Sequence, residues 1–291
     1  MLLRIASILF PVFAIVGVGY LYALRHKPDM LVANRLTMDV FVPALVFAAL
    51  AGKSYSIDSY AGLALATLVM VVGSGLVAWP VARAMGIAPK TFVPPMMFNN
   101  SGNLGLPLAV LAFGDAALAP AIVMFLVSNL MHFSFGAWLL DHGVRLTTMW
   151  RIPVVQATIA GLAVSFLEIP IWEPLLIGIR MLGDIAIPLL LFALGVRLTD
   201  VRLNDWQHAI AGAVVRPVIG MAICWGMGVA LGLDAAQQGM LLVFGALPPA
   251  VLNYVFAERY QQEPEKVASL VLIGNLAALL FLPIALALAL E

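Results

Sequence analysis

Charged side chains are scarce in this 291-residue chain and make up only 10% of it. Hydrophobic residues account for 63%, and the mean hydropathy is +1.05, both far outside the range of soluble domains. The 15 basic and 15 acidic residues cancel, so no net charge indicates a nucleic-acid partner. With a single cysteine, Cys224, the chain cannot form an internal disulfide, and a metal-thiolate cluster is not expected. The composition predicts an all-α polytopic membrane protein.

Signatures of membrane enzymes are also missing. The chain contains no His-Glu-x-x-His sequence, no pair of aspartates in a Gly-rich protease setting and no nucleophile-base pair. None of the four histidines has another histidine four residues away. His132 is better explained as a core histidine than as a proton relay. We therefore expect no enzyme activity, no cofactor and no metal site.

Apolar runs of about the length of a bilayer span, roughly 20 residues, occur ten times. They cover Ile5–Leu24, Leu31–Ala51, Tyr60–Ala82, Phe92–Phe113, Ala119–Leu140, Pro153–Leu167, Leu175–Val196, Gln207–Leu231, Gln238–Ala257 and Val267–Leu290. The first run has no signal-peptide cleavage site, so it is expected to stay as the first helix. The sixth run is the shortest and needs its flanks to cross.

The distribution of Lys and Arg predicts the orientation in the membrane. Loops after the odd-numbered spans, with the helix ends beside them, hold twelve of the 15 basic residues, among them Arg216; Arg4, Lys53 and Arg180 face the other side. By the positive-inside rule, the side with twelve is cytoplasmic. The prediction is a multi-pass protein of the cell (inner) membrane with both termini on the non-cytoplasmic side.

An internal repeat relates the two halves of the chain. The residues Arg35, Asp39, Pro43, Phe47 and Ala48 recur 145 positions later as Arg180, Asp184, Pro188, Phe192 and Ala193. With a shift of 146, Trp79, Gly86, Phe98 and Asn129-Leu130 meet Trp225, Gly232, Phe244 and Asn275-Leu276. Each half, 1–148 and 149–291, then holds five spans. An odd number inverts the second copy, which is the plan of many secondary transporters.

The fourth span contains residues that oppose an unbroken helix. Its centre reads F-N-N-S-G-N-L-G-L-P, and Pro107 can neither donate a backbone hydrogen bond nor avoid the preceding turn. Irregular backbone at membrane depth persists only where it lines a cavity or is packed in protein. The repeat demands a matching break in the ninth span, and Pro248 and Pro249 lie in its middle. Two such interruptions are typical of a transporter's substrate site at the membrane centre.

These two spans resemble the auxin efflux carrier family. Its bacterial members are similar to one another in a fourth helix with an Asn-Ser/Thr-Gly core, then Gly-x-Pro, then Phe-Gly. Here the corresponding residues are Asn100-Ser101-Gly102, Gly105-Leu106-Pro107 and Phe113-Gly114. The run L-P-P-A-V-L-N-Y-V-F-A-E-R-Y from Leu247 resembles the family's second crossing helix. The likeness covers nearly the whole chain in span order.

The resemblance implies a ten-helix fold similar to that of bile acid/sodium symporters. Spans one, two, six and seven would form a scaffold, spans three to five and eight to ten a mobile transport core, and spans four and nine would cross at the substrate. Members of the family move organic anions, including auxin in plants and malonate or malate in bacteria. This chain lacks the long central hydrophilic loop of the plant members and has Asn253 where they tend to carry a second proline.

Two interpretations of the polar residues at the break remain open. The amides of Asn99, Asn100, Asn103 and Asn253, with the Ser101 hydroxyl, could bind a carboxylate, helped by the dipole of a half-helix that begins near Pro107. Alternatively, they satisfy carbonyls that the break itself frees. The crossover residues Gly102, Gly105, Pro107, Pro248 and Pro249 are expected to be architectural.

Charged residues inside the predicted spans are the other candidates. Asp39 and Asp184 are candidates for proton or cation coupling. Each also follows an arginine, Arg35 or Arg180, by four residues, which favours a structural ion pair on one helix face. Arg216 could offer a positive charge to an anion, but Pro217 beside it favours a helix bend instead.

The prediction is a secondary transporter of small organic anions, mono- or dicarboxylates such as malonate or malate, with auxin-like acids possible, working by elevator-type alternating access. The alternative is a proton- or sodium-coupled symporter of the bile acid/sodium symporter type. The expected partners are the organic anion, the lipid bilayer, a coupling ion and a second copy of the chain that docks through the scaffold helices.

Overall fold

The computed structural model describes residues 1–51, 58–142, 150–199 and 206–290. Regular structure among these residues is helical, apart from one isolated antiparallel bridge between Asn99 and Pro249. The all-α prediction is therefore confirmed for the part of the chain that is described. The predicted boundary between the two halves, at residues 148 and 149, lies outside it.

Seven continuous helical segments among the described residues are long and apolar enough to cross a membrane. They cover Leu3–His26, Leu31–Ala51, Tyr60–Ala84, Asp115–Leu140, Glu173–Arg197, Trp206–Leu231 and Pro264–Ala289. These coincide with seven of the ten predicted spans, which confirms a polytopic membrane protein. The other three, the fourth, sixth and ninth, fall on shorter helices. The count of ten and the five-plus-five repeat stay predictions.

The chain divides into two compact units. The first combines Met1–Phe10, Gly62–Val144 and Asp200–Glu291, and the second combines Pro11–Ala61 and Arg145–Thr199. Each unit therefore draws on both halves of the sequence. The long first helix, α1 (Leu2–His26), begins in the first unit and continues in the second.

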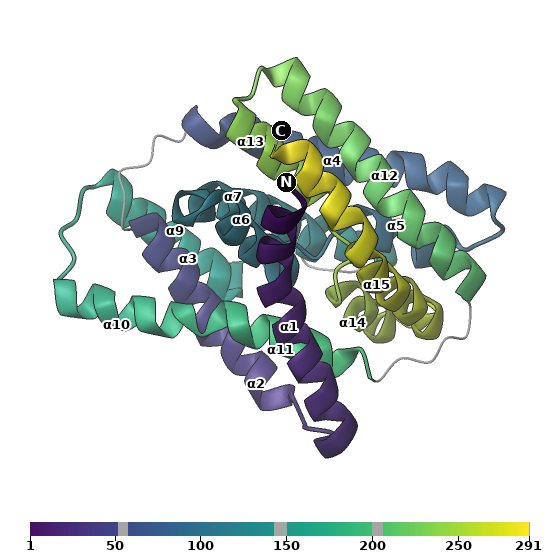
Figure 1. Ribbon diagram of the computed structural model, residues 1–291, viewed down its shortest axis with the longest axis horizontal. Coiled ribbons are helices and arrows are strands. Elements are labelled where there is room, and N and C mark those ends of the chain that lie inside the picture. Colours follow the sequence, from purple (N-terminus) through teal and green to yellow (C-terminus); the bar gives the residue numbers. More distant parts are fainter. Residues whose placement is uncertain (52–57, 143–149, 200–205, 291) are drawn as a thin grey trace. The chain divides into compact units, whose positions relative to one another are not determined.

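The second unit is a packed group of helices. Besides α1 it holds α2 (Leu31–Leu36), the π-helical turn η1 (Thr37–Phe41), α3 (Val42–Ala51), α9 (Pro153–Phe166), α10 (Glu173–Asp184) and α11 (Ala186–Arg197). α3 packs against α9 and α10, and Figure 1 shows these three side by side. Gly161 of α9 permits this, because a Cβ there would lie 3.0 Å from the side chain of Leu50.

Glycines also bring the backbones of α1 and α11 into direct contact. A Cβ at Gly19 would lie 2.2 Å from the carbonyl oxygen of Phe192, and one at Gly195 would lie 2.0 Å from that of Val16. No water is released when apolar helices associate in lipid, so close packing of small residues is a main source of helix affinity there. This contact therefore requires glycine on both helices.

The first unit contains the remaining helices. They are α4 (Asp58–Ala84), whose first residues belong to the second unit, α5 (Pro89–Met97), the π turn η2 (Ser101–Gly105), α6 (Leu106–Phe113), the 3-10 turn η3 (Asp115–Ala117), α7 (Leu118–Met131), the π turn η4 (His132–Gly136), α8 (Ala137–Leu140), α12 (Trp206–Leu231), α13 (Ala235–Ala246), α14 (Leu252–Arg259) and α15 (Pro264–Ala289). The yellow α15 and the green α12 run beside each other in Figure 1, and both contact α13.

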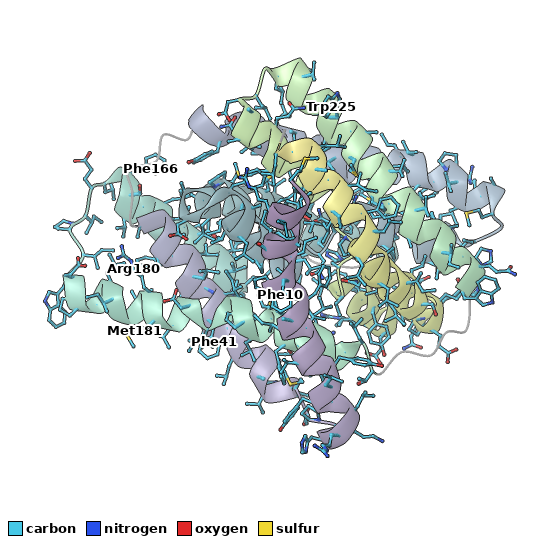
Figure 2. All side chains as sticks on the ribbon, in the orientation of Figure 1. Phe10, Phe41, Phe166, Arg180, Met181 and Trp225 are labelled. Atoms are coloured by element: carbon cyan, nitrogen blue, oxygen red, sulfur yellow. The ribbon has the colours of Figure 1, made fainter. Side chains whose placement is uncertain are left out.

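Small residues face the interior along α12. Gly212 lies against Leu270 of α15 and Met96 of α5, where a Cβ would approach them to 2.5 and 3.1 Å. Gly220 lies two turns further along and meets the backbone of Gly245 in α13. Trp225, by contrast, projects from the outer side of the helix and is half exposed (Figure 2). α12 thus presents a narrow face of small residues to α5, α13 and α15.

One of the basic residues on the predicted cytoplasmic side, Arg216, carries no information on orientation. Its side chain is completely buried within the first unit. It therefore reports nothing about which side of the membrane its helix end faces, and eleven basic residues remain on that side. Three of the basic residues used, Lys53, Arg145 and Arg202, lie outside the described residues. The orientation stays a prediction.

Candidate functional site: the crossing of two broken helices

The helix α13 ends because two prolines follow it. A residue before proline is pushed away from helical backbone angles, and both Leu247 and Pro248 precede a proline. Leu247 accordingly has φ −58° and ψ 141°, an extended conformation, directly after the last helical residue, Ala246. Helix resumes only at Leu252, in α14. The predicted break in the ninth span therefore lies at residues 247–251.

The fourth span breaks for a different reason. α5 ends at Met97, and Phe98 is extended, with φ −103° and ψ 108°. Asparagine and serine, which compete for backbone hydrogen bonds, follow at 99–101. Helix then restarts at Ser101, and the carbonyl of Asn100 accepts from the N–H groups of Leu104 and Gly105.

The half-helix was predicted to begin near Pro107, and this position is wrong by one and a half turns. A helical segment runs unbroken from Ser101 to Phe113, and Pro107 lies inside it. The first turn is π-helical, with the N–H of Leu106 bonded to the carbonyl of Ser101. Proline lacks an N–H and crowds the carbonyl four residues earlier, and the wider π turn accommodates both effects. The positive end of the helix dipole therefore lies at Ser101.

The two breaks are joined by backbone hydrogen bonds. The N–H of Asn100 donates to the carbonyl of Pro248 over 2.8 Å, and the N–H of Ala250 donates to that of Phe98 over 2.9 Å. Asn99 and Pro249 sit between these bonds as the antiparallel bridge. Pro249 has no backbone N–H, but the bridge does not require one there, because its two bonds come from the N–H groups of Asn100 and Ala250. The predicted crossover residues Pro248 and Pro249 thus hold the two broken helices together.

Three asparagines at the crossing bind protein carbonyls. Asn99 Nδ2 donates to the carbonyl of Phe244 (2.7 Å), and Asn253 Nδ2 donates to that of Phe98 (3.0 Å). Asn275, from α15, donates to the carbonyl of Pro249 (3.1 Å) and accepts from Asn100 Nδ2 (3.1 Å). These bonds supply donors to backbone carbonyls at helix ends, which otherwise remain unpaired. For Asn99 and Asn253, the geometry favours the structural alternative over direct substrate contact.

Two predicted site residues keep their polar side chains free. In the described part of the chain, neither Ser101 nor Asn103 makes a side-chain hydrogen bond. Both lie in the first turn of the helix, where backbone N–H groups have no intrahelical acceptor. Ser101 is buried and Asn103 is half-buried. The first turn therefore combines free N–H groups, a hydroxyl and an amide in one place, which is a suitable environment for an anion.

The crossover glycines allow the half-helices to pack closely. A Cβ at Gly105 would lie 2.9 Å from the side chain of Leu247 and 3.0 Å from that of Phe244, and one at Gly102 would lie 3.0 Å from Phe125. The contacts of Gly105 join η2 to the end of α13. Its predicted architectural role therefore has a direct steric reason.

His132 lies next to the crossing, within an aromatic cluster. Its ring stacks on Phe98 with centroids 4.1 Å apart and contacts Phe256 at 4.8 Å. Its Nε2 and the Oδ1 of the neighbouring Asn253 are both buried without an assigned partner, and they are a complementary donor and acceptor. The stacking favours the interpretation of His132 as a core residue.

Asp39 and Asp184 belong to the second unit and are not part of this crossing. Both carboxylates are exposed, and no ion pair among the described residues joins them to Arg35 or Arg180, so the predicted structural pairs are absent. Arg180, which Figure 2 labels on α10, is also exposed. Each aspartate precedes a proline by four residues, so its backbone carbonyl has no helical N–H donor from that position.

Arg216 is a further polar residue beside the crossing, although the sequence favoured only a helix bend at this point. It lies in α12, is completely buried, and donates from Nη1 to the carbonyl of Gly245 over 3.1 Å. That carbonyl directly follows the one bound by Asn99, so Arg216 reaches the end of α13 beside the crossing. The signal was an arginine within an apolar span, which is by default a functional candidate. The described residues contain no cluster of three metal-ligating side chains.

A family model described as "Membrane transport protein" matches residues 142–286. A Rhizobium meliloti protein named "Putative malonate transporter" is 28% identical over 302 aligned positions, which cover 94% of this chain and 92% of that protein. This similarity therefore extends over both predicted halves and includes both breaks.

Plant proteins match over a shorter stretch. A protein of Oryza sativa subsp. japonica named "Probable auxin efflux carrier component 3b" is 30% identical over 145 positions, 46% of this chain and 24% of the plant protein. "Auxin efflux carrier component 6" of Arabidopsis thaliana is 24% identical over 136 positions, 44% of this chain and 24% of its own length. The matched regions span about a quarter of these plant relatives.

Proposed function

We propose that this chain, which belongs to the auxin efflux carrier family of membrane transport proteins, is a secondary carrier of small organic anions. Malonate and malate are the first candidate substrates, and auxin-like acids are further candidates. The strongest support is the crossing, where backbone hydrogen bonds join the two breaks. There a half-helix starts at Ser101 beside the end of another helix at Ala246. Its relatives are named as transporters, and no role as an enzyme is proposed.

The first turn at Ser101 is the proposed substrate contact. A carboxylate there accepts hydrogen bonds from the free backbone N–H groups, and the helix dipole favours its negative charge. The Ser101 hydroxyl and the Asn103 amide supply further donors, since neither side chain hydrogen-bonds to another described residue. An indirect role is proposed for Asn99, Asn100 and Asn253, whose amides bind protein groups at the two breaks and so fix the position of one break against the other. The donors at this first turn are therefore neutral groups.

Movement of the first unit relative to the second is the proposed transport step. The first unit gathers the residues of the predicted spans three to five and eight to ten, and most of the others lie in the second. This grouping supports an elevator in which the crossing travels with the first unit. A homodimer formed through the second unit, and an inner-membrane location with both termini outside the cytoplasm, belong to the same proposal.

Coupling to a proton or sodium gradient is the second candidate. The feature in its favour is the pair Asp39 and Asp184, each a carboxylate beside a backbone carbonyl that a proline deprives of its helical donor. Unwound carbonyls and carboxylates are ligands that coupling ions use. If Asp39→Asn and Asp184→Asn remove the dependence of uptake on a gradient but leave exchange of the anion intact, the coupled mechanism holds.

The test of the carrier is uptake and counterflow of radiolabelled malonate and malate by purified protein in proteoliposomes, with electrical currents recorded alongside. We expect Asn103→Ala and Ser101→Ala to weaken the apparent affinity about tenfold, since each removes one hydrogen bond to a charged group. Ser134→Ala is the matched control, because that hydroxyl bonds to its own helix at Leu130. Absence of counterflow for every carboxylate in a broad panel would refute the proposal.

A further inference from the structure

The guanidinium of Arg216 is incompletely paired inside the first unit. Its side chain has no exposed area, and its single hydrogen bond runs from Nη1 to Gly245. Both Nε and Nη2 are buried without an acceptor. Among the residues that the structure describes, no carboxylate forms an ion pair with it. A buried charge without a partner is strongly unfavourable, so these two nitrogens require an acceptor that the protein itself does not supply.

The two free nitrogens form one edge of the guanidinium. Nε–H and one N–H of Nη2 are parallel and point the same way, whereas Nη1 lies on the opposite side of the group. A carboxylate accepts such a parallel pair through both oxygens, which is the strongest and most specific arrangement that arginine offers. The pairing of Nη1 with Gly245 therefore leaves free the edge that suits a carboxylate.

The surrounding backbone fixes the orientation of this edge. A Cβ at Gly220 would lie 2.2 Å from Nη1 of Arg216 and 2.1 Å from the carbonyl oxygen of Gly245. A Cβ at Gly245 would lie 2.6 Å from the carbonyl oxygen of Gly220. Only glycine at both positions lets α12 and α13 come this close and lets the guanidinium reach the carbonyl. The close backbone contacts around Nη1 thus fix the orientation of the Arg216 side chain.

A purely structural role does not account for these facts. An arginine at the end of α13 does balance the negative end of that helix, and one hydrogen bond from Nη1 achieves this. The role leaves the Nε edge unused. By the 146-residue shift that aligns Trp79 with Trp225, the first half has a buried Met70 at the corresponding position. An apolar side chain of similar length therefore suffices for packing at that point of the repeat.

We propose that Arg216 binds a carboxylate of the transported anion through its Nε–H and Nη2–H edge. The inference rests on the proposed carrier function and sharpens its substrate class. The first turn at Ser101 takes one carboxylate, and Arg216 takes the second, so the site prefers short dicarboxylates to monocarboxylates of the same chain length. The arginine is closed off from solvent.

The test is equilibrium binding of malonate and of propionate, which has the same number of carbons but one carboxylate, to the purified full chain in detergent. Wild type should bind malonate more tightly. We expect Arg216→Met, which copies the residue of the first half, and Arg216→Lys, which keeps the charge but loses the parallel pair, to weaken malonate binding by on the order of tenfold to a hundredfold. Propionate binding should change much less, so the preference collapses.

The control is Arg83→Met, because Arg83 is an exposed arginine of the same unit that lies over the ring of Trp79. It should keep both affinities. Folded Arg216→Met with an unchanged preference for malonate would overturn the proposal. If that variant does not fold, Arg216→Lys decides, and an unchanged preference there overturns the bidentate contact. Failure of wild type to bind any carboxylate would instead overturn the proposed function.

Discussion

Asn275→Ala and Asn129→Ala should differ in their effect on stability, although the internal repeat aligns these two asparagines. Asn275 and Asn129 align at the 146-residue shift, yet only Asn275 reaches the crossing. Asn275→Ala leaves the carbonyl of Pro249 without its donor and Asn100 Nδ2 without its acceptor. The carbonyl of Val271 loses little, because it also serves the backbone of its own helix.

The expected magnitude follows from these two orphaned groups. Each buried polar group left unpaired costs about 1–3 kcal/mol, whereas hydrogen bonds between membrane helices average only about 0.6 kcal/mol. We therefore expect Asn275→Ala to lower the free energy of unfolding by about 2 kcal/mol. Asn129 is half-buried, and its amide donates to Phe125 on its own helix. Asn129→Ala should then change stability by less than about 0.5 kcal/mol.

The assay is reversible unfolding of the purified protein in mixed micelles by increasing fractions of a denaturing detergent, followed by tryptophan fluorescence. The two variants and wild type are compared under one set of conditions, so that errors of extrapolation cancel. Equal losses for Asn275→Ala and Asn129→Ala would refute the reasoning, because burial of an asparagine alone, and not its contact with the crossing, would then set the cost.

Two further predictions concern the helices away from the crossing. Gly195→Ala should lower the free energy of unfolding by at least about 1–3 kcal/mol, because its Cβ would lie 2.0 Å from the backbone of α1. Gly17→Ala should be neutral or stabilising, because no atom lies within 4 Å of a Cβ there. Equal effects of the two variants in detergent melts would contradict the packing argument. Hydrogen bonds from Lys266 and Thr91 lower the pKa of Glu263, so its contribution to stability is fully present above the ordinary carboxyl pKa of 4.5 and is lost as the pH falls further. Glu263→Gln should therefore reduce the loss of melting temperature on acidification, and a wild-type acid profile in that variant would show that the carboxylate does not matter.

Much of the site could be predicted from the sequence because its causes are local. Pro248 and Pro249 exclude helical backbone at Leu247 wherever the chain goes, so the second break was visible in the residues alone. Long apolar runs likewise predicted seven spans that the structure bears out. The position of the half-helix was predicted less well, because Pro107 was assumed to start it. A π turn instead carries the helix back to Ser101, and its hydrogen bonds depend on how the whole turn closes.

A helical membrane protein with two interrupted spans could be predicted from the residues alone, since hydropathy and proline act on each segment separately. Which polar side chains bind the carbonyls at the breaks depends on how the helices pack. Asn99 and Asn253 donate to carbonyls 145 and 155 residues away, while the side chains of Ser101 and Asn103 bind no carbonyl in the described part of the chain. Burial of Arg216 against Gly245 was likewise invisible, because a side chain's partners depend on which helices pack around it and not on its neighbours in the chain.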